Sequence, residues 1–174
     1  MTTIIRPAAE ADLPAILAIY NDAVAKTTAI WNDQPVDLAN RRAWFHARAA
    51  QGFPVLVAEE DGLTVGYGSF GDFRPFDGYR FTVEHSVYVA EGVRRRGIAS
   101  ALLASLEERA RDMGKHVMVA GIASDNDASL RLHERLGFVE TGRMSEVGFK
   151  FGRWLDTVQM QRPLGPGATT TPQS

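Results

Sequence analysis

The segment from Thr82 to Leu103 constrains this chain more than any other part of the sequence. It reads TVEHSVYVAEGVRRRGIASALL, which is an apolar strand, a glycine- and arginine-rich turn and then an amphipathic helix. Small residues at the helix start let a ligand approach the backbone, and the free N–H groups of the first turn attract negative charge. The segment therefore predicts a binding site for an anion such as a pyrophosphate.

Two common phosphate-binding loops do not match this segment. The nucleotide P-loop needs Lys followed by Ser or Thr after its last glycine, and the dinucleotide fingerprint needs three spaced glycines and a later acid. The sequence instead has Arg94-x-x-Gly97-x-Ala99 directly after a strand, with Arg95 and Arg96 inside it. A solvated charge run is the alternative interpretation, but three arginines at a glycine helix entrance favour phosphate.

The composition predicts one globular domain over residues 1–164. The 174 residues are 45% hydrophobic, and the 19 Lys and Arg nearly balance 21 Asp and Glu, so we expect neither nucleic acid nor a membrane as partner. The chain has no cysteine, which excludes a disulfide framework, a thiolate metal site and an acyl-cysteine intermediate. We expect no metal. The N-terminus lacks a signal-peptide core and no apolar run could span a bilayer, so the cytoplasm is the expected location.

Strand and helix patterns alternate along the chain. Asp12 and Asp37 are expected helix caps, Asn126 or Asp127 caps a later helix, and Asp61-Gly62 predicts a hairpin turn. Strands interrupted by helices favour an α/β layer architecture, and the hairpins indicate a sheet of mixed direction. The segment 165–174 contains only Gly, Ala, Pro, Thr and other polar residues, so it is expected to be disordered. Strands are expected at 3–6, 55–59, 64–70, 82–89, 116–122, 138–147 and 154–161.

Several segments together resemble one enzyme superfamily. Arg94-x-x-Gly97-x-Ala99 is similar to the (Gln/Arg)-x-x-Gly-x-(Gly/Ala) signature of the GNAT superfamily of acyl-CoA-dependent N-acetyltransferases. The resemblance extends over about Ile4 to Leu164 and is greatest to the phosphinothricin and methionine sulfoximine N-acetyltransferases. It implies a GNAT fold, with a central, mixed, splayed sheet of about seven strands flanked by about four helices. The further matching segments are Thr82–Val89, Asn126-x-x-Ser129-x-x-Leu132-His133-Glu-Arg-Leu-Gly137-Phe138 and Lys150–Asp156.

The resemblance also implies acetyl-CoA as the acyl donor and a set of residues that bind it. The pantetheine arm is expected between the strand ending at Val89 and the next strand, where unpaired backbone groups can bind its amides. The implied cofactor-binding residues are Val87, Tyr88, Val89, Arg95, Arg96, Gly97, Ile98, Ala99, Ser100 and Asn126. Asn126 and Ser129 also stand at a helix start, where capping alone would explain them.

Amide formation requires a base, because most amines are protonated at neutral pH. Glu84, three residues before Val87, is the candidate base, because the resemblance assigns proton removal to this position. The alternative is a glutamate on the wet face of a strand. His85 is the rival base, but strict alternation places it with Val83 and Val87 on the opposite face, where a core histidine is the better interpretation. His133 aligns with the superfamily's tyrosine acid. It could protonate the leaving thiolate, the thiolate could leave unaided, or His133 could be a helix-surface residue.

The acceptor is expected to bind in the loops. Arg74 could hold a carboxylate beside Pro75 and Phe76, although the aromatic residues there could equally be core and Arg74 surface. In the resembled group the acceptor is the α-amine of phosphinothricin, methionine sulfoximine or methionine sulfone. The implied substrate-binding residues are Arg74, Pro75, Phe76, Glu84, His85 and Ser86.

We therefore expect a direct N-acetyltransferase for a small amine acceptor. The resemblance further implies a homodimer whose site is completed by 150–156. Two alternatives remain open at this point. The acceptor could be a polyamine or a protein N-terminus, or the domain could sense acetyl-CoA without catalysis.

Overall fold

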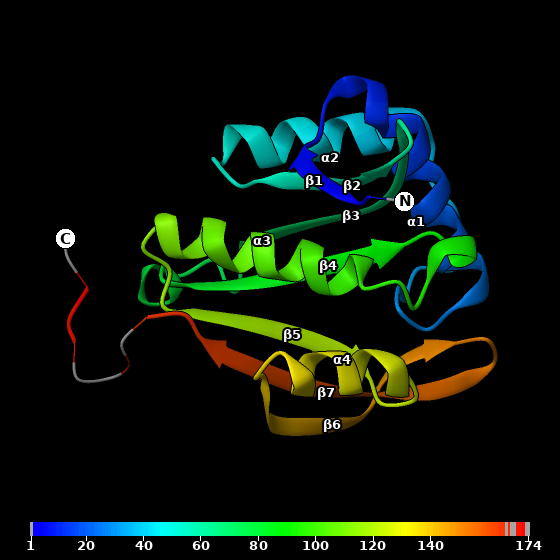
Figure 1. The fold of residues 1–174 in the computed structure, drawn as a ribbon. Helices are drawn as coiled ribbons and strands as arrows, with labels where there is room; N and C mark the ends of the chain where they lie inside the picture. Colours follow the sequence, from blue (N-terminus) through cyan, green and yellow to red (C-terminus); the bar gives the residue numbers. More distant parts are fainter. Residues whose placement is uncertain (1, 166, 168–169, 173–174) are drawn as a thin grey trace.

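A computed structural model describes residues 2–165, 167 and 170–172 and contains one seven-stranded sheet (Figure 1). The strand order is β1-β2-β3-β4-β5-β7-β6, and β4 with β5 is the parallel pair in an otherwise antiparallel sheet. The described chain also has four α-helices and three short 3-10 helices. The predicted α/β fold with a mixed sheet of about seven strands and about four helices is thus confirmed.

The elements follow the expected alternation with small shifts at their ends. The last hairpin is longer than expected, because both of its strands extend towards the turn. The strands are β1 Ile4–Pro7, β2 Val55–Glu60, β3 Leu63–Asp72, β4 Thr82–Val89, β5 Val117–Ala123, β6 Val139–Lys150 and β7 Arg153–Pro163. The α-helices are α1 Leu13–Lys26, α2 Leu38–Ala50, α3 Ile98–Asp112 and α4 Asp127–Arg135, and the 3-10 helices are Glu10–Asp12, Asp77–Tyr79 and Glu91–Val93.

Two apolar clusters lie on opposite faces of the sheet. The larger cluster packs α3 and α4 against one face, and the smaller packs α1 and α2 against the other (Figure 1). Strand β4 contributes to both, because alternate side chains of a strand point to opposite faces. Val83 and Val87 belong to the α3 side, whereas Tyr88 packs on the α1 side. The predicted separation of the two faces of β4 is confirmed.

Two of the expected helix caps, Asp37 and Asn126, make capping hydrogen bonds, and Asp12 does not. Asp37 accepts a hydrogen bond from the Asn40 N–H at 2.8 Å, and Asn126 accepts one from the Ser129 N–H at 3.2 Å. Asp12 stands at the N-cap of α1 but makes no capping bond within that helix. The sequence pattern correctly placed the helix start there, but the role of the carboxylate was wrong.

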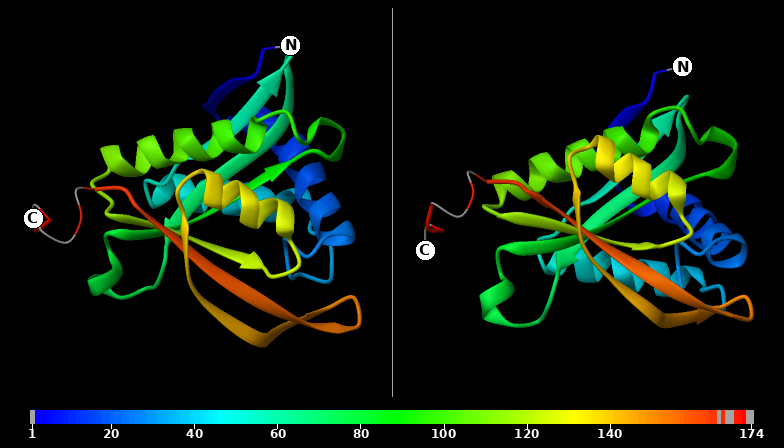
Figure 2. Two further views of the ribbon diagram at one scale, coloured as in Figure 1. Left: turned by 60° about the horizontal axis from the view of Figure 1, so that its bottom comes forward. Right: turned by 90° about the horizontal axis from the view of Figure 1, so that it is seen from below.

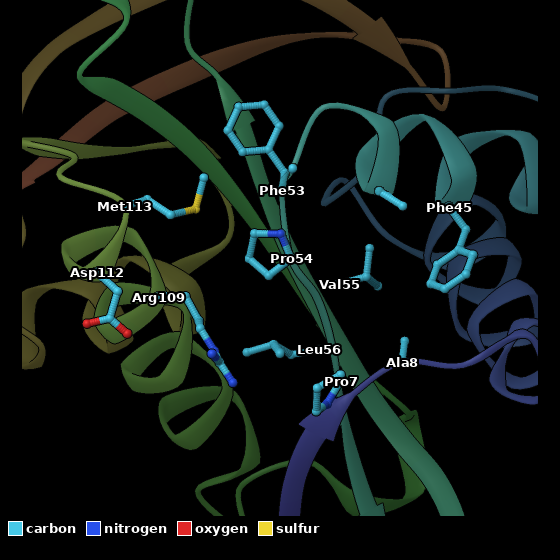
Figure 3. Close-up of a pocket in the computed structure, with 12 residues that line it drawn as sticks. Pro7, Ala8, Phe45, Phe53, Pro54, Val55, Leu56, Arg109, Asp112 and Met113 are labelled. Carbon is cyan, nitrogen blue, oxygen red and sulfur yellow. The ribbon is translucent and has the colours of Figure 1, made fainter.

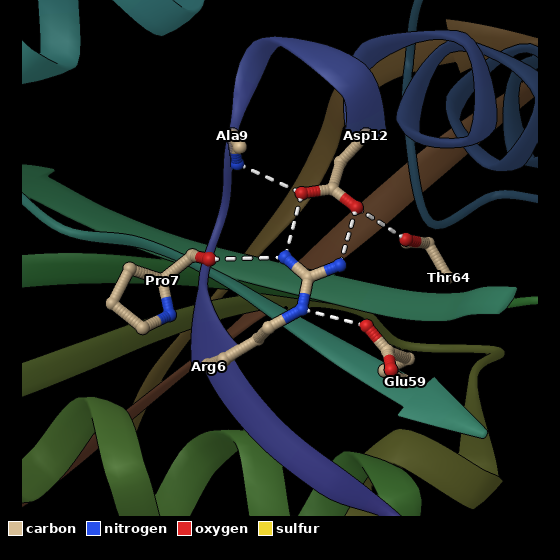
Figure 4. A network of polar contacts seen from close by, with 6 residues as sticks. All are labelled: Arg6, Pro7, Ala9, Asp12, Glu59 and Thr64. Atoms are coloured by element: carbon tan, nitrogen blue, oxygen red, sulfur yellow. Dashed lines mark hydrogen bonds and ion pairs between the residues drawn. The ribbon is translucent and has the colours of Figure 1, made fainter. Parts of the chain in front are cut away.

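The Asp12 carboxylate instead joins the N-terminal strand to the sheet (Figure 4). It accepts two hydrogen bonds of 2.8 Å from Arg6, one from the Ala9 N–H and one from Thr64, while Arg6 also reaches Glu59. These bonds lower the pKa of Asp12 to about 2, and the hydrogen bond from Arg6 is the largest cause. A polar network therefore fixes β1 and the entry to α1.

The predicted disordered tail and the predicted single domain are not tested by the described residues. The expected disordered segment 165–174 includes 166, 168–169 and 173–174, which lie outside the described residues, so that expectation remains a prediction. The single domain at 1–164 likewise remains a prediction. Over the ranges that are described, no helix is long and apolar enough to cross a membrane.

Candidate functional site

Strands β4 and β5 separate after a short parallel start. Their pairing covers only Thr82–Glu84 against Val117–Val119, after which β4 continues along β3 and β5 continues along β7. The backbone groups that face each other across the opening are therefore left without a strand partner in this pair. A cavity of about 110 Å³ lies there. Its lining residues are Ala29, His85, Ser86, Val87, Tyr88, Ala99, Leu103, Ala120, Gly121, Ile122, Ala123, Asn126, Ser129, Leu132 and His133.

This opening fits an extended arm that carries amide groups. Such a ligand needs backbone partners, and a separated strand pair offers them without special side chains. Asn126 contributes as well: its Oδ1 accepts the capping bond from Ser129, which leaves its two N–H donors free of that bond. The predicted residues Val87, Tyr88, Ala99 and Asn126 are thus brought together at one cavity.

The entrance to α3 has the backbone geometry of an anion site. Gly97 is the N-cap with φ of 81°, a conformation that favours glycine, and no side chain caps the helix there. The N–H groups of Ile98, Ala99 and Ser100 have no acceptor within the helix by its geometry. Arg95 also has a positive φ, of 66°. The backbone donors of this turn are therefore available to a phosphate ligand.

The three arginines of this turn have different surroundings. Arg96 forms an ion pair with Glu60, at 3.1 Å between Nη1 and Oε2, and Arg94 makes a long contact to the Val89 carbonyl. Arg95 is exposed. Glu60 on β2 therefore neutralises part of the expected positive charge. The free N–H groups at the start of α3 contribute more to an anion site than the number of arginines suggests.

Glu84 lies half-buried on the face of β4 opposite His85, as strict alternation predicted, and this face is the α1 side of the sheet. Its Oε1 atom lies over Gly121 on β5, where an added Cβ would come within 3.2 Å of it. The amide of Gln159 and the hydroxyl of Thr157 lie near the same point. Burial raises the pKa of Glu84 and the positive charge of Arg74 opposes that rise. The carboxylate is thus a better base than an exposed glutamate.

His85 and His133 form a buried pair on the other face. Their Nε2 atoms lie 3.1 Å apart, the rings stack at 5.1 Å, and both pack against Phe138. The His133 Nδ1 atom lies 2.7 Å from the Ser129 carbonyl. A carbonyl only accepts, so His133 carries its proton on Nδ1, and His85 must donate from Nε2 to His133.

This arrangement keeps both imidazoles neutral. Burial lowers the pKa of His85 to about 3, with a further contribution from His133, and burial lowers the pKa of His133 as well. The Nδ1 proton of neutral His133 is hydrogen-bonded to the Ser129 carbonyl, and its Nε2 atom carries no proton. This arrangement disfavours His133 as the general acid. The helix-surface alternative for His133 is wrong, because the residue is buried. The interpretation of His85 as a hydrogen-bonded core histidine is confirmed.

The predicted acceptor loop lies beside this site but outside the cavity lining. Arg74 stacks on Phe73 at 4.1 Å and donates to the Phe73 carbonyl. Its charge affects Glu84, so the two side chains are electrostatic neighbours. Phe76 is 70% exposed, which excludes the alternative that it is core. Pro75 is exposed too, whereas Ser86 lines the cavity directly.

Sequence reasoning missed Gly121 and Asp125, and it expected Lys150 only as part of the segment 150–156 that would complete the site across a homodimer. Gly121 lies within the apolar run of β5, and a glycine inside a strand is a signal for close approach by another group. Lys150 is buried, and Asp125 bridges Thr28 and Arg153. No local pattern marks these contacts, because each one joins residues far apart in the sequence.

Figure 3 shows a larger hollow, of about 510 Å³. Its walls come from α2, the start of β2 and the end of α3, and include Phe45, Phe53 and Met113. Among its lining residues only Arg109 and Asp112 are charged. The hollow is larger, but the smaller cavity between β4 and β5 has the free backbone groups, the start of α3 and Gly121, over which the Glu84 carboxylate lies. In the described part of the chain, no group of three or more acidic or histidine side chains could hold a metal.

Comparisons with known proteins agree on one family. The profile of the "Acetyltransferase (GNAT) family" matches residues 16–138. The L-methionine sulfoximine/L-methionine sulfone acetyltransferase of Pseudomonas paraeruginosa is 61% identical over 167 residues, which are 95% of this chain and 97% of that protein. The phosphinothricin N-acetyltransferase of Alcaligenes faecalis is 44% identical over 97% of this chain and 86% of that protein.

Two solved structures have the same fold. An acetyltransferase of Salmonella typhimurium solved with its cofactor acetyl-CoA has a TM-score of 0.95 and 54% identity, and the match covers 100% of this chain and 99% of that one. A ribosomal-protein-alanine N-acetyltransferase of Brucella melitensis has a TM-score of 0.91 and 56% identity over 92% of this chain and 99% of that one.

Proposed function

This chain belongs to the GNAT family of acetyltransferases, and we propose that it acetylates the α-amine of a small amino-acid-like acceptor. Methionine sulfoximine, methionine sulfone and phosphinothricin are the acceptors we favour, with acetyl-CoA as the donor. The observation that carries this proposal is the 61% identity, over 95% of this chain, to an enzyme named for the first two acceptors.

The residues at the opening between β4 and β5 fit the donor. The N–H groups of Ile98, Ala99 and Ser100 at the start of α3 would hold its diphosphate, with Arg95, Arg96 and Gly97 completing the turn. Backbone groups of Val87–Val89 and the Asn126 side chain would bind its pantetheine arm. Bound in this way, acetyl-CoA supplies an activated acetyl group at the Glu84 end of the opening.

Glu84 would act as the general base, directly or through a water molecule. The acceptor nitrogen bonds to the acetyl carbon, the carbon–sulfur bond breaks, and the nitrogen loses a proton to the base. Burial raises the pKa of Glu84, which makes its carboxylate a stronger proton acceptor than an exposed glutamate. The full chain has no cysteine, which supports direct transfer without an acyl-cysteine.

The leaving thiolate would depart without a proton from His133. That residue is neutral, and its Nε2 atom already accepts from His85. A thiol with a pKa of about 8.5 is a tolerable leaving group, so a dedicated acid is not required. We therefore assign the His85–His133 pair to shaping the cavity wall.

Arg74 would bind the carboxylate of the acceptor. Among the residues that the structure describes, Arg74 forms no ion pair, and its exposed guanidinium lies close enough to Glu84 to oppose the rise that burial causes in the pKa of that carboxyl. Guanidinium and carboxylate groups match in geometry and can form two parallel hydrogen bonds. Pro75 and Phe76 would contact the acceptor side chain, and Glu84 and Ser86, on one face of β4, would lie along its other side. His85, which the sequence also suggested for this role, is buried on the opposite face and would not reach the acceptor.

A homodimer would cover the outer face of the last hairpin. Strand β6 is the edge of the sheet, and Figure 2 shows the β6–β7 hairpin reaching past the neighbouring elements. Five large apolar side chains are exposed there, which supports burial against a second copy. They are Met144, Val147, Phe149, Phe151 and Trp154. Light scattering at assay concentrations tests this, and a monomer would contradict it.

A protein N-terminus is the second candidate acceptor. It is favoured by the 56% identity to the Brucella melitensis enzyme, which is named for ribosomal protein alanine. The exposed Arg74 speaks against it, because a polypeptide has no carboxylate beside its terminal amine.

A thiol-release assay decides between these acceptors. The purified chain would be supplied with acetyl-CoA and a panel of amino acids, their sulfoximine, sulfone and phosphinate analogues, polyamines and peptides beginning with alanine. We expect turnover with the small amino-acid analogues. Turnover with the peptides alone would replace the proposal by the second candidate, and acetyl-CoA binding without any turnover would indicate a sensing domain. The cytoplasmic location also remains part of this proposal.

A further inference from the structure

Lys150 is a buried cation at the end of β6. The residue is 2% exposed, and its Nζ atom donates hydrogen bonds to the carbonyls of Val24, Thr27 and Ile30, at 2.6, 2.8 and 2.5 Å. An ammonium group has three donors and no acceptor, so all of its donors are used. Because a buried charge without partners is very unfavourable, this residue can be buried only where three acceptors converge.

The three acceptors belong to the end of α1 and the loop that follows it. Helix α1 ends at Lys26, so the Val24 carbonyl is one of the last four, which have no partner within the helix. The partial negative charge of a helix C-terminus also favours a cation there. Thr27 and Ile30 lie in the loop before α2. Lys150 therefore holds the loop 27–31 against the helix from a distant part of the chain.

The same hairpin and the loop after β5 make further contacts with this segment. The ring of Trp31 fills the space over Gly148 on β6, where an added Cβ would come within 2.2 Å of the ring. Trp31 also donates to the Thr28 carbonyl, and Asp125 accepts from both Thr28 and Arg153. Several contacts therefore hold the loop 27–31, and the hydrogen bonds of Lys150 are the most buried of them.

This loop forms part of the candidate site. Ala29 lines the cavity between β4 and β5, together with Ser86 and Gly121. Gly121 is also the residue over which the Glu84 carboxylate lies. A shift of the loop would therefore change the wall next to the base without touching the entrance to α3.

We propose that Lys150 is a positioning residue for the acceptor: its ammonium fixes the loop 27–31 as the wall facing Glu84. The inference rests on the proposed acetyl transfer. Lys150 contacts neither the acceptor nor the donor and acts only through the backbone of the loop. Convergence of three carbonyls on one atom suits the compact ammonium of lysine and not the planar fork of arginine.

The test is removal of the side chain followed by chemical rescue. Lys150→Ala removes three carbons and the nitrogen, which n-propylammonium can replace. Propyltrimethylammonium keeps the charge but lacks N–H donors and serves as the negative control. Lys150→Met keeps an apolar side chain of similar length if the alanine variant folds poorly. The matched control is Lys26→Met, which removes an exposed lysine at the same helix end.

We expect Lys150→Ala to lower kcat/KM for the acceptor on the order of tenfold to a hundredfold, mainly through a higher KM, because misplacement of a reacting group by about 1 Å can cost a hundredfold in rate. The Kd for CoA should stay unchanged, and amide hydrogen exchange over 27–32 should become faster. Added n-propylammonium should reverse both effects, whereas propyltrimethylammonium and Lys26→Met should have none. Wild-type protein with n-propylammonium alone checks that this amine is not itself acetylated.

Two results would overturn the proposal. One is an unchanged acceptor KM and unchanged exchange in the loop when the ammonium is removed. The other is a parallel loss of CoA affinity, thermal midpoint and acceptor binding that n-propylammonium does not restore, since that pattern means a purely structural lysine. If wild-type protein acetylates no acceptor, the proposed function fails, and the exchange of 27–32 still shows separately whether Lys150 holds the loop.

Discussion

The two halves of the candidate site are built in opposite ways. The proposed diphosphate corner comes from one continuous stretch, 94–100, whose backbone N–H groups would bind the donor. The proposed acceptor side combines the loop 27–31, the 74–76 loop, strands β4 and β5 and the β6–β7 hairpin. A site made of consecutive backbone groups can be recognised from a motif, whereas one made of distant side chains depends on the whole fold. The following predictions test this separation.

The largest effect is expected at Glu84. In Glu84→Gln, kcat/KM for the acceptor should fall on the order of a hundredfold to ten-thousandfold, the usual contribution of a general base. The Kd for CoA should not change, since Glu84 lies away from the diphosphate corner. Steady-state kinetics and calorimetry measure the two quantities. An unaltered rate at neutral pH would remove Glu84 from the mechanism.

The pH profile follows from the same residue. A base must be deprotonated, so the wild-type kcat/KM should fall as pH decreases through the pKa of Glu84, which burial raises. In Glu84→Gln that decline should be replaced by a rise towards high pH, where the acceptor amine loses its proton to solvent. Superimposable profiles of the two proteins would contradict the assignment.

Arg74→Ala should act on the acceptor side only. Loss of a charged hydrogen-bonding group predicts an increase of the acceptor KM on the order of thirtyfold. The KM for acetyl-CoA should remain as it was, because Arg74 does not line the cavity between β4 and β5. Arg143→Ala is a suitable control, since that arginine is paired with Glu140 on the outer strand. Equal effects on both substrates would discredit the carboxylate site.

Gly97→Ala should act on the donor side only. The φ of 81° at Gly97 costs alanine about 1–2 kcal/mol, so the turn of the variant relaxes in the free protein. CoA must restore the turn on binding, which predicts a Kd for CoA about tenfold higher. The acceptor KM should not respond. Gly92→Ala is the matched control, because an added Cβ meets nothing within 4 Å at either position and only Gly97 has a positive φ. Similar affinities in both variants would show that the backbone at Gly97 is not needed.

Structural features that depend on neighbouring residues could be predicted from the sequence. The period of two along β4 placed Glu84 and His85 on opposite faces, and Asp37 and Asn126 cap their helices, because such features depend on neighbouring residues. His133 and Lys150 could not be judged in this way. Each is polar and buried only because a partner far along the chain satisfies it, so the sequence near them predicts exposure.

The smallest kinetic effect is expected from Asp12→Asn, which lies in neither half of the site. The lowered pKa, about 2 against an ordinary 3.8, means that the ionised Asp12 stabilises the folded chain by about 2 kcal/mol at neutral pH. This stabilisation is fully present above the ordinary value and is lost as pH falls through about 2. Denaturant unfolding should show that difference between wild type and variant at pH 7 and its decline in acid, with acetyl transfer unchanged. A stability difference that does not depend on pH would contradict the network in Figure 4.

A crystal structure with CoA and methionine sulfoximine bound together tests the central claim most directly. The account predicts the diphosphate against the N–H groups of 98–100, the pantetheine arm between β4 and β5, and the acceptor amine within reach of Glu84, directly or through one water. A diphosphate bound elsewhere, or an amine on the His133 face of the sheet, would contradict it.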